Sequence, residues 1–436
     1  MSFDAVIVGA GCAGLGAAAA LRKFGLRAIV LEASSRVGGR AHTADPAPFG
    51  GAVFDRGASW LHAAERNPLV PIAREAGETL TNSDQYRARR TFVGDRLATA
   101  TERAEFDASW DRFGQLTASR AAEAADTSVA DAIAPLRADP WTATVETWEA
   151  AQIAAADPRR LSVKDLHRNQ FDGGNFEVDR GLGSFVARCL APLAGEIRLS
   201  TPVSRIAWNG TGVTVDTPDG TVQARACIVT VSTGVLASGA IGFDPPLPAD
   251  VADAIDGLPM GLLTKVALRA TDADRFGLPD YCGLSRRVEQ PFAPNVSFLA
   301  WPMGRDHIVG FVGGHTAWSF AGQHPGAIDA FVREQLRRFV GAGAERRMVT
   351  ADVTDWGADP LFLGAYAYAL PGSAYARDKL AEPLAGGRLI FAGEATCTDG
   401  LAGTVGGAWN SGKAAAQAVA SMLRKRSSTS RFATLP

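Results

Sequence analysis

The N-terminal segment is a succession of apolar and glycine-rich stretches. Residues 3–8 are short, apolar and rich in β-branched side chains, which is typical of a buried parallel strand. Residues 9–16 are glycine-rich, residues 17–24 are good helix formers, and residues 27–31 form a second apolar run. Because a strand, a turn, a helix and another strand follow one another within about thirty residues, the pattern predicts a β-α-β unit.

The pattern changes twice further along the chain. Residues 100–167 are rich in alanine and predicted to be helical, whereas residues 196–231 read as short strands. Asn209-Gly210 and Asp219-Gly220 separate these strands and are typical of hairpin turns. At the end of the chain we expect, in order, a strand at 388–391, a glycine-rich loop, a helix at 406–423 and a frayed basic segment from residue 424.

The length of 436 residues is sufficient for two domains. We expect an α/β fold in which a Rossmann-like domain with a parallel sheet is interleaved with an α+β domain that binds the substrate. The Rossmann-like domain is predicted to combine residues 1–65, 195–255 and 381–424. The substrate-binding domain then comprises residues 66–194 and 256–380, and residues 425–436 form a flexible tail.

Composition argues against several classes of function. With a formal net charge of -2, no electrostatic attraction to nucleic acid or to an anionic membrane is predicted. No run of about 20 apolar residues predicts a membrane-spanning helix. The five cysteines contain no C-x-x-C pair, which favours reduced thiols and a cytoplasmic location and argues against a disulfide-reductase mechanism. The histidines form no metal-binding motif, so no metal site is expected.

The glycine-rich turn has the spacing of a dinucleotide-binding loop. Gly9, Gly11 and Gly14 form a G-x-G-x-x-G pattern between the first strand and the first helix, and Glu32 follows the second strand. In such a loop the first glycine makes the turn, the second admits the pyrophosphate and the third permits close helix–strand packing. Glu32 is expected to accept hydrogen bonds from the ribose hydroxyls.

Directly after Glu32, two arginines bracket a glycine pair in Arg36-Val37-Gly38-Gly39-Arg40. This combination resembles the second cofactor fingerprint of the flavin amine oxidase superfamily. Further matches follow in the family's order, and together they place the resemblance closest to the polyamine oxidases and flavin-type lysine demethylases. They are residues 57–62 (G-A-S-W-L-H) with Asn67-Pro68, residues 261–266, Trp356 with Asp359-Pro360 and residues 364–368, residues 391–396 (F-A-G-E-A-T), and residues 403–408.

The resemblance implies that FAD is the cofactor. Val405 is expected to begin a last helix whose N-terminus stabilises negative charge at the flavin ring, and Val203 is expected to touch the adenine through its backbone. Glu394 is expected beside the ribityl chain or the diphosphate. The cofactor-binding residues expected from motif and resemblance are Gly9, Gly11, Gly14, Glu32, Arg40, Gly57, Ala58, Ser59, Trp60, Val203, Gly393, Glu394, Thr404 and Val405.

Two residues are assigned catalytic roles by the resemblance. Lys265 is expected to hydrogen-bond a water molecule beside flavin N5, and a lysine buried there would have a lowered pKa suited to proton transfer. The alternative is an exposed lysine on an edge strand. Tyr366 is expected to form a wall of the substrate pocket, with Thr404 in place of a second tyrosine and His62 at the entrance. Ala365 stands where monoamine oxidases attach flavin through cysteine, so FAD is expected to be non-covalent.

The resemblance implies hydride transfer from an amine to the flavin, hydrolysis of the resulting imine, and reduction of dioxygen to hydrogen peroxide. The substrate stays open at this point. A polyamine would require carboxylates, for which Asp172, Glu177 and Asp179 are candidates, and an aromatic or alicyclic amine fits equally well. The residues at 57–60 lack the arginine with which amino-acid oxidases bind a carboxylate. A desaturase or isomerase of lipids or isoprenoids and a redox-inert FAD-binding scaffold are the alternative functions.

Overall fold

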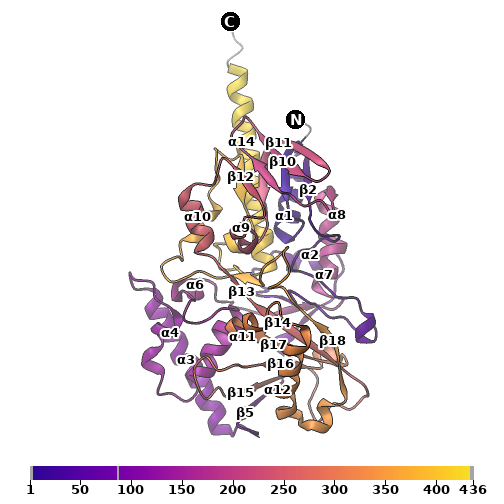
Figure 1. Cartoon of the computed structure of the whole chain (residues 1–436), viewed down its shortest axis with the longest axis vertical. Helices are drawn as coiled ribbons and strands as arrows, with labels where there is room; N and C mark the ends of the chain where they lie inside the picture. Colours follow the sequence, from indigo (N-terminus) through magenta and orange to yellow (C-terminus); the bar gives the residue numbers. More distant parts are fainter. Residues whose placement is uncertain (1–2, 86–87, 433–436) are drawn as a thin grey trace.

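The N-terminal strand lies inside a mixed sheet in one half of the molecule (Figure 1). The structure, a computed structural model, describes residues 3–85 and 88–432, with residues 426–432 as backbone only. The strand order is β12-β9-β10-β11-β1-β2-β8, and β20 pairs with β11. Its strands are β1 (Phe3–Val8), β2 (Ala28–Leu31), β8 (Glu196–Arg198), β9 (Arg205–Ala207), β10 (Val213–Thr217), β11 (Gly220–Val229), β12 (Gly242–Asp244) and β20 (Leu389–Phe391).

The parallel part of this sheet is buried on both faces, as the continuous apolar pattern predicted. Alternate side chains of β1 enter different cores: Ile7 packs on the side of α1 (Cys12–Lys23) and α14 (Val405–Phe432), and Val6 on the opposite side. Helices α10 (Ala249–Asp256) and α13 (Ala376–Ala381) cover that second face. The predicted α/β fold with a Rossmann-like parallel sheet is therefore confirmed.

Helices α1 and α14 pack side by side against the sheet, although they come from opposite ends of the chain (Figure 1). Two glycines permit the close approach of their backbones. A Cβ atom on Gly16 would lie 2.7 Å from the carbonyl oxygen of Trp409, and one on Gly412 would lie 1.9 Å from that of Ala13. Any larger residue at either position would force the two helices apart.

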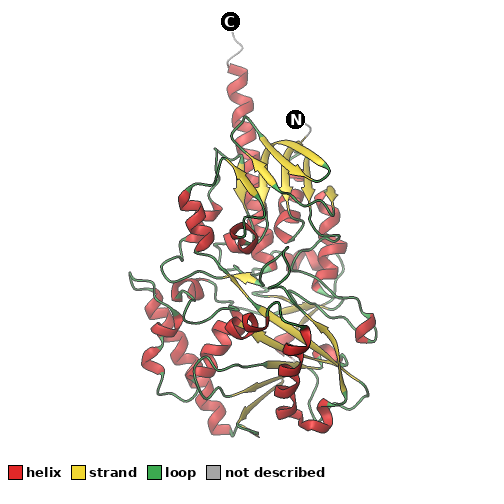
Figure 2. Cartoon of the chain, in the orientation of Figure 1, coloured by secondary structure: helices red, strands yellow, loops and turns green. Residues whose placement is uncertain are grey.

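A second sheet lies in the other half of the molecule, and Figure 2 shows the two groups of strands well separated. Its order is β18-β14-β17-β16-β15-β5-β6. Helix α12 (Pro325–Glu345) packs on one face through Ile328, Val332 and Leu336. The strands are β5 (Ala88–Val93), β6 (Arg96–Leu97), β14 (Leu263–Ala270), β15 (Cys282–Arg286), β16 (Ser297–Ala300), β17 (His307–Gly313) and β18 (Met348–Val353).

The predicted helical region at 100–167 is confirmed, but it is broken into several pieces. They are α3 (Ala100–Ala121), α4 (Val129–Ala132), α5 (Thr142–Glu146), a π-helical turn (Thr147–Ile153) and α6 (Val163–Arg168). The remaining helices are α2 (Leu69–Glu75), α7 (Leu182–Phe185), α8 (Ala191–Ala194), α9 (Thr233–Ala237) and α11 (Gly314–Phe320). The remaining strands are β3 (Trp60–Leu61), β4 (Leu80–Asn82), β7 (Phe176–Val178), β13 (Met260–Gly261) and β19 (Tyr366–Ala367).

The last helix is longer than the sequence indicated. Helix α14 runs to Phe432, so the backbone of residues 424–432 is helical where a frayed segment was expected. Residues 433–436 of the expected tail lie outside the described residues.

The structure predicts that a buried ion pair between α6 and α13 is important for stability. Arg377 donates from Nε and Nη2 to the two carboxylate oxygens of Asp165, at 2.7 and 2.8 Å, and both side chains are buried. Arg377→Met would leave the Asp165 charge without its counter-ion, so we expect the free energy of unfolding to fall by about 3–5 kcal/mol. Chemical denaturation measures this change.

A matched control lies on the same two helices. Arg168 and Asp378 form an exposed pair at 2.7 Å, so Arg168→Met should lower the free energy of unfolding by less than about 1 kcal/mol. Equal effects of the two substitutions would contradict the importance of the buried pair.

Candidate active site

One cavity of about 700 Å³ is lined by segments from both halves of the molecule. Its lining runs from the glycine-rich turn after β1, through β14, to the start of α14. Every site residue predicted from the sequence lies on the lining except Gly14, which lies behind the turn. The structure therefore brings together residues that are separated by up to almost the whole length of the chain.

The three glycines of the first turn have three distinct environments. Gly9 has φ +104°, and a Cβ atom there would lie 2.7 Å from Oγ1 of Thr230. A Cβ atom on Gly14 would lie 1.9 Å from the carbonyl oxygen of Gly9, which explains the need for glycine at the helix–strand contact. A Cβ atom on Gly11 would meet nothing within 4 Å, because this glycine faces open space in the cavity.

Glu32 holds the glycine-rich turn in place. Its Oε2 accepts a hydrogen bond from the backbone N–H of Ala10 at 2.6 Å, and its Oε1 accepts one from the backbone N–H of Ser34 at 2.8 Å. The sequence did not predict this structural role. A carboxylate oxygen can accept more than one hydrogen bond, so the expected contact with a ribose is compatible with it and stays a prediction.

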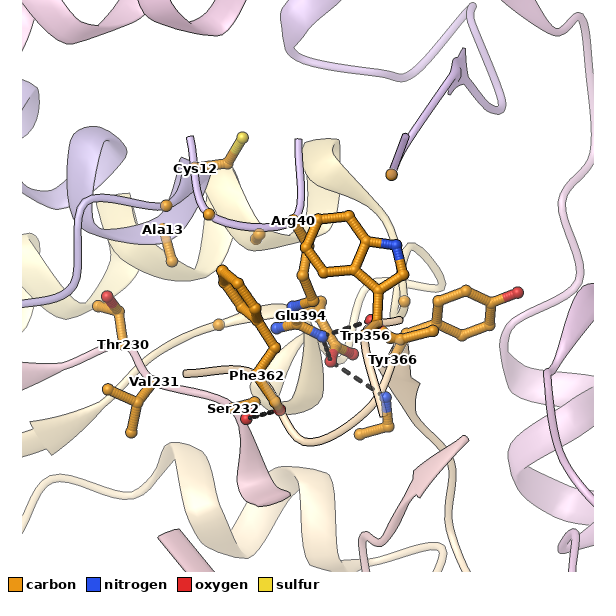
Figure 3. Close-up of a pocket in the computed structure, with 18 of the residues that line it drawn as sticks. Cys12, Ala13, Arg40, Thr230, Val231, Ser232, Trp356, Phe362, Tyr366 and Glu394 are labelled. Atoms are coloured by element: carbon orange, nitrogen blue, oxygen red, sulfur yellow. Dashed lines mark hydrogen bonds and ion pairs between the residues drawn. The ribbon is translucent and has the colours of Figure 1, made fainter. Parts of the chain in front are cut away.

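Arg40 and Glu394 connect the N-terminal and C-terminal motifs across the cavity (Figure 3). Arg40 Nη1 donates to Glu394 Oε1 at 2.9 Å and to the carbonyl oxygen of Ala365 at 2.7 Å. Ala367 N donates to the same glutamate oxygen at 3.0 Å. The other oxygen, Glu394 Oε2, is buried without a hydrogen-bond partner among the described residues. A buried acceptor of this kind needs a donor, and a hydroxyl group of a bound cofactor is one such donor.

Two helix N-termini meet the cavity. Gly11 and Cys12 at the start of α1 and Val405 at the start of α14 all lie on the lining. Helix N-termini present unpaired N–H groups and partial positive charge, which suit the anionic parts of a flavin dinucleotide. Gly393 adds a second position where a Cβ atom would meet nothing within 4 Å. These features suit a dinucleotide such as FAD.

Thr404 is the N-cap of α14. Its Oγ1 accepts a hydrogen bond from Gly407 N at 3.0 Å and donates to the carbonyl oxygen of Leu401 at 2.7 Å. Thr404 lies on the lining as predicted, but its hydroxyl hydrogen is already donated to the carbonyl oxygen of Leu401.

Lys265 is buried on β14, between β18 and β17, so the alternative of an exposed edge-strand lysine is wrong. Its Nζ donates to Asp55 O at 2.8 Å, Gly57 O at 2.6 Å and Ser59 Oγ at 2.7 Å. These bonds use all three donors of an ammonium group. Burial lowers the pKa of Lys265 to about 8, against the opposing effect of the Asp55 and Glu177 carboxylates. The expected bond to a water molecule stays a prediction.

Aromatic side chains form part of the cavity wall. The Tyr366 hydroxyl donates to the carbonyl oxygen of Gln152 at 3.3 Å, and burial raises the pKa of Tyr366 well above its ordinary value. Trp356 and Phe362 pack edge to face, with ring centroids 5.1 Å apart, and Figure 3 shows Trp356 between Phe362 and Tyr366. The lining around the predicted catalytic residues is therefore largely apolar.

His62 is a well-packed residue of the lining. Its ring stacks on Phe171 with centroids 4.9 Å apart, and its Nδ1 lies 2.6 Å from Oδ1 of Asn175. Trp60, on β3 just before His62, donates from Nε1 to the hydroxyl of Tyr281 at 3.3 Å. These contacts orient both side chains within the chain itself.

The three carboxylates that were candidates for binding a polyamine, Asp172, Glu177 and Asp179, do not line the cavity. Glu177 accepts a hydrogen bond from the Tyr281 hydroxyl, and Asp179 accepts one from Thr81 at 2.8 Å. Position in the sequence gave no information on which way these side chains point. Sequence analysis also missed lining residues with no motif signal, namely Gln152, Asp165, Asn169, Phe171 and Arg377.

Comparison with known proteins gives the family. Residues 146–420 match the family described as flavin containing amine oxidoreductase, and residues 7–75 match the NAD(P)-binding Rossmann-like domain. The chain belongs to the flavin-containing amine oxidoreductase family. The resemblance seen in the motifs is thereby confirmed.

Similar proteins are found in both branches that the motifs indicated. The chain is 31% identical to Lysine-specific histone demethylase 1 homolog 3 of Oryza sativa subsp. japonica over 93% of its own length, but spans about half (52%) of that protein. It is 29% identical to Polyamine oxidase 1 of Oryza sativa subsp. japonica, covering 90% of this chain and 92% of the relative.

Solved structures show the same fold. A structure of putrescine oxidase bound to putrescine matches with a TM-score of 0.77 at 23% identity, covering 95% of this chain and 98% of that one. Cyclohexylamine oxidase from Brevibacterium oxydans IH-35A matches with a TM-score of 0.78 at 23% identity, covering 97% and 99%. In addition, no helix among the described residues is long and apolar enough to cross a membrane.

The environments of Gly11 and Gly14 predict that one substitution impairs cofactor binding and that the other impairs folding. Gly11→Ala places its methyl group in open space, so we expect the flavin content to fall sharply while the unfolding free energy of the flavin-free protein changes by less than about 0.5 kcal/mol. Gly14→Ala forces a backbone clash and should destabilise the flavin-free protein by about 1–3 kcal/mol or more. Absorbance at the flavin band and denaturation of the flavin-free proteins measure both effects. Full flavin content in Gly11→Ala would contradict the expected path of the cofactor.

Proposed function

We propose that the protein is an FAD-dependent amine oxidase that acts on the C–N bond of an amine. The observation that carries the proposal is a single cavity whose lining contains the G-x-G-x-x-G turn together with Lys265 and Tyr366. When bound, FAD supplies a hydride acceptor at flavin N5, so that the amine becomes an imine that water hydrolyses, and dioxygen is afterwards reduced to hydrogen peroxide. This site, within the family, gives no reason for a second candidate function.

The residues of the chain have separate roles in this proposal. Gly11, Gly393 and the two helix N-termini leave room and positive potential for the dinucleotide, and Glu394 Oε2 would be available to accept a hydrogen bond from it. Tyr366 and its aromatic neighbours hold the amine and exclude water. Lys265 holds or releases a proton near neutral pH, because burial has brought its pKa to about 8.

We further propose that FAD is held without a covalent bond. Ala365 lies on the lining, and its carbonyl oxygen accepts the hydrogen bond from Arg40. A methyl side chain cannot form a thioether, so the bound flavin should be released intact on denaturation. The cytoplasmic location favoured by the cysteines stays a prediction; all five thiols are free in the structure.

Anaerobic mixing of the FAD-loaded protein with amines tests the proposal. We expect at least one amine to bleach the flavin absorbance, and admission of air to restore it with formation of hydrogen peroxide. Titration with dithionite is the control for a competent flavin. If dithionite bleached the flavin and no amine from a panel of alkyl, cyclic, aromatic and polyamines did so, the proposal would be wrong.

Lys265 predicts a specific pH dependence of the step with dioxygen. A proton donor acts only while it is protonated, so the rate of reoxidation should fall as the pH rises through about 8. Lys265→Met should lower the reoxidation rate by roughly 100-fold. The fall of this rate near pH 8 should then be absent from the pH profile. Stopped-flow reoxidation from pH 6 to 10 measures both. If the reoxidation rate of Lys265→Met fell by the same factor at the same pH as that of the parent protein, this role for the lysine would be excluded.

A further inference from the structure

We propose that the cavity selects amines that carry one positively charged nitrogen on an apolar body, and that it discriminates against diamines and polyamines. This inference rests on the proposed function and specifies its substrate class. It is carried by the charges on the lining and by the partners that each of them already has.

The described lining is not acidic. It contains three carboxylates, Glu32, Asp165 and Glu394, and four basic side chains, Arg40, Arg56, Lys265 and Arg377. A site that binds polycations requires an excess of negative charge, because each ammonium group that leaves water needs a counter-ion. The balance of charge here is the reverse.

Asp165, the lining carboxylate on α6, has no capacity for a second ammonium group. Asp165 Oδ1 accepts from Arg377 Nε at 2.7 Å and from Asn169 Nδ2 at 3.0 Å. Asp165 Oδ2 accepts from Arg377 Nη2 at 2.8 Å and from Ala369 N at 2.8 Å. Four hydrogen bonds, two of them from an arginine, satisfy this carboxylate completely.

The other two carboxylates serve the cofactor end. Glu32 is bound to the glycine-rich turn, and Glu394 is paired with Arg40 at 2.9 Å. Among the basic side chains, Arg56 is itself paired with Asp352 at 2.7 Å. The ion pairs Arg40–Glu394 and Arg377–Asp165 are each neutral, so neither attracts a distant ammonium group strongly.

The substrate walls offer apolar contact and a neutral acceptor with no partner of its own. Side chains without charge that line this part are Ile153, Leu161, Leu166, Phe171, Tyr366 and Tyr368. Beside them, Asn169 directs Nδ2 toward Asp165, so that its Oδ1 is buried without a partner in the described structure. A neutral amide oxygen can accept a hydrogen bond from an amine, but it cannot compensate for a second full charge.

Two matched pairs of substrates test the inference. Hexylamine and 1,6-diaminohexane differ by one terminal amino group, and cyclohexylamine and trans-1,4-diaminocyclohexane differ in the same way on a ring. In at least one pair we expect kcat/KM for the monoamine to exceed that for the diamine by on the order of 100-fold, because the second ammonium group is desolvated without a counter-ion. Spermidine should be oxidised no faster than the diamines.

A substitution on the wall should reverse the selectivity. Ile153 lies on the lining and is 38% exposed, so a charged side chain fits there without being fully buried. Ile153→Glu provides the missing counter-ion, and we expect the monoamine-to-diamine ratio to fall by at least about tenfold. Ile153→Gln has nearly the same size and polarity without the charge, and its ratio should stay within about threefold of the parent protein.

The outcomes separate this inference from the proposed function. If the diamine reduced the flavin as well as or better than the monoamine in both pairs, the protein would be an amine oxidase but the inferred selectivity would be wrong. If equal changes in ratio occurred in Ile153→Glu and Ile153→Gln, charge would not be the cause of the selectivity. If no amine reduced a flavin that dithionite reduces, both proposals would fail.

Discussion

The structure depends on the close packing of α1 against α14. Gly16 and Gly412 bring the two backbones together, and a side chain at either position would collide with a carbonyl oxygen of the other helix. Because both helices begin at the cavity, this contact fixes two N-termini beside the same site. The first and last motifs of the chain can therefore bind one ligand only if this helix pair forms.

Buried charge is organised around that contact. Arg40 joins the loop after β2 to Glu394, and Arg377 joins α13 to Asp165 on α6, so both halves of the molecule are fixed to strand β19 between them. Both pairs make further hydrogen bonds with the backbone, and Glu394 Oε2 is the one carboxylate oxygen of the two pairs that has no partner among the described residues. The same pairing leaves the carboxylates of Glu394 and Asp165 already bound to arginines, which is the basis of the selectivity that we propose.

Elements that depend on the pattern of neighbouring residues could be predicted from the sequence. Apolar runs and glycine spacing predicted β1, α1 and β2, and the resemblance placed Lys265, Tyr366 and Glu394 on one cavity. Sequence patterns failed where orientation depends on tertiary packing. Glu177 points to Tyr281 and not to the cavity, Asp165 and Asn169 had no motif to reveal them, and the second half of α14 contains residues that are equally compatible with a tail.

The most direct test of the account is the identity of the nucleotide that the purified protein contains after reconstitution with FAD. Acid precipitation followed by chromatography of the supernatant and the pellet measures it. The account predicts stoichiometric, intact FAD in the supernatant. Retention of flavin in the pellet would contradict the non-covalent site, and a bound nicotinamide dinucleotide with no affinity for FAD would contradict the assignment of the cavity.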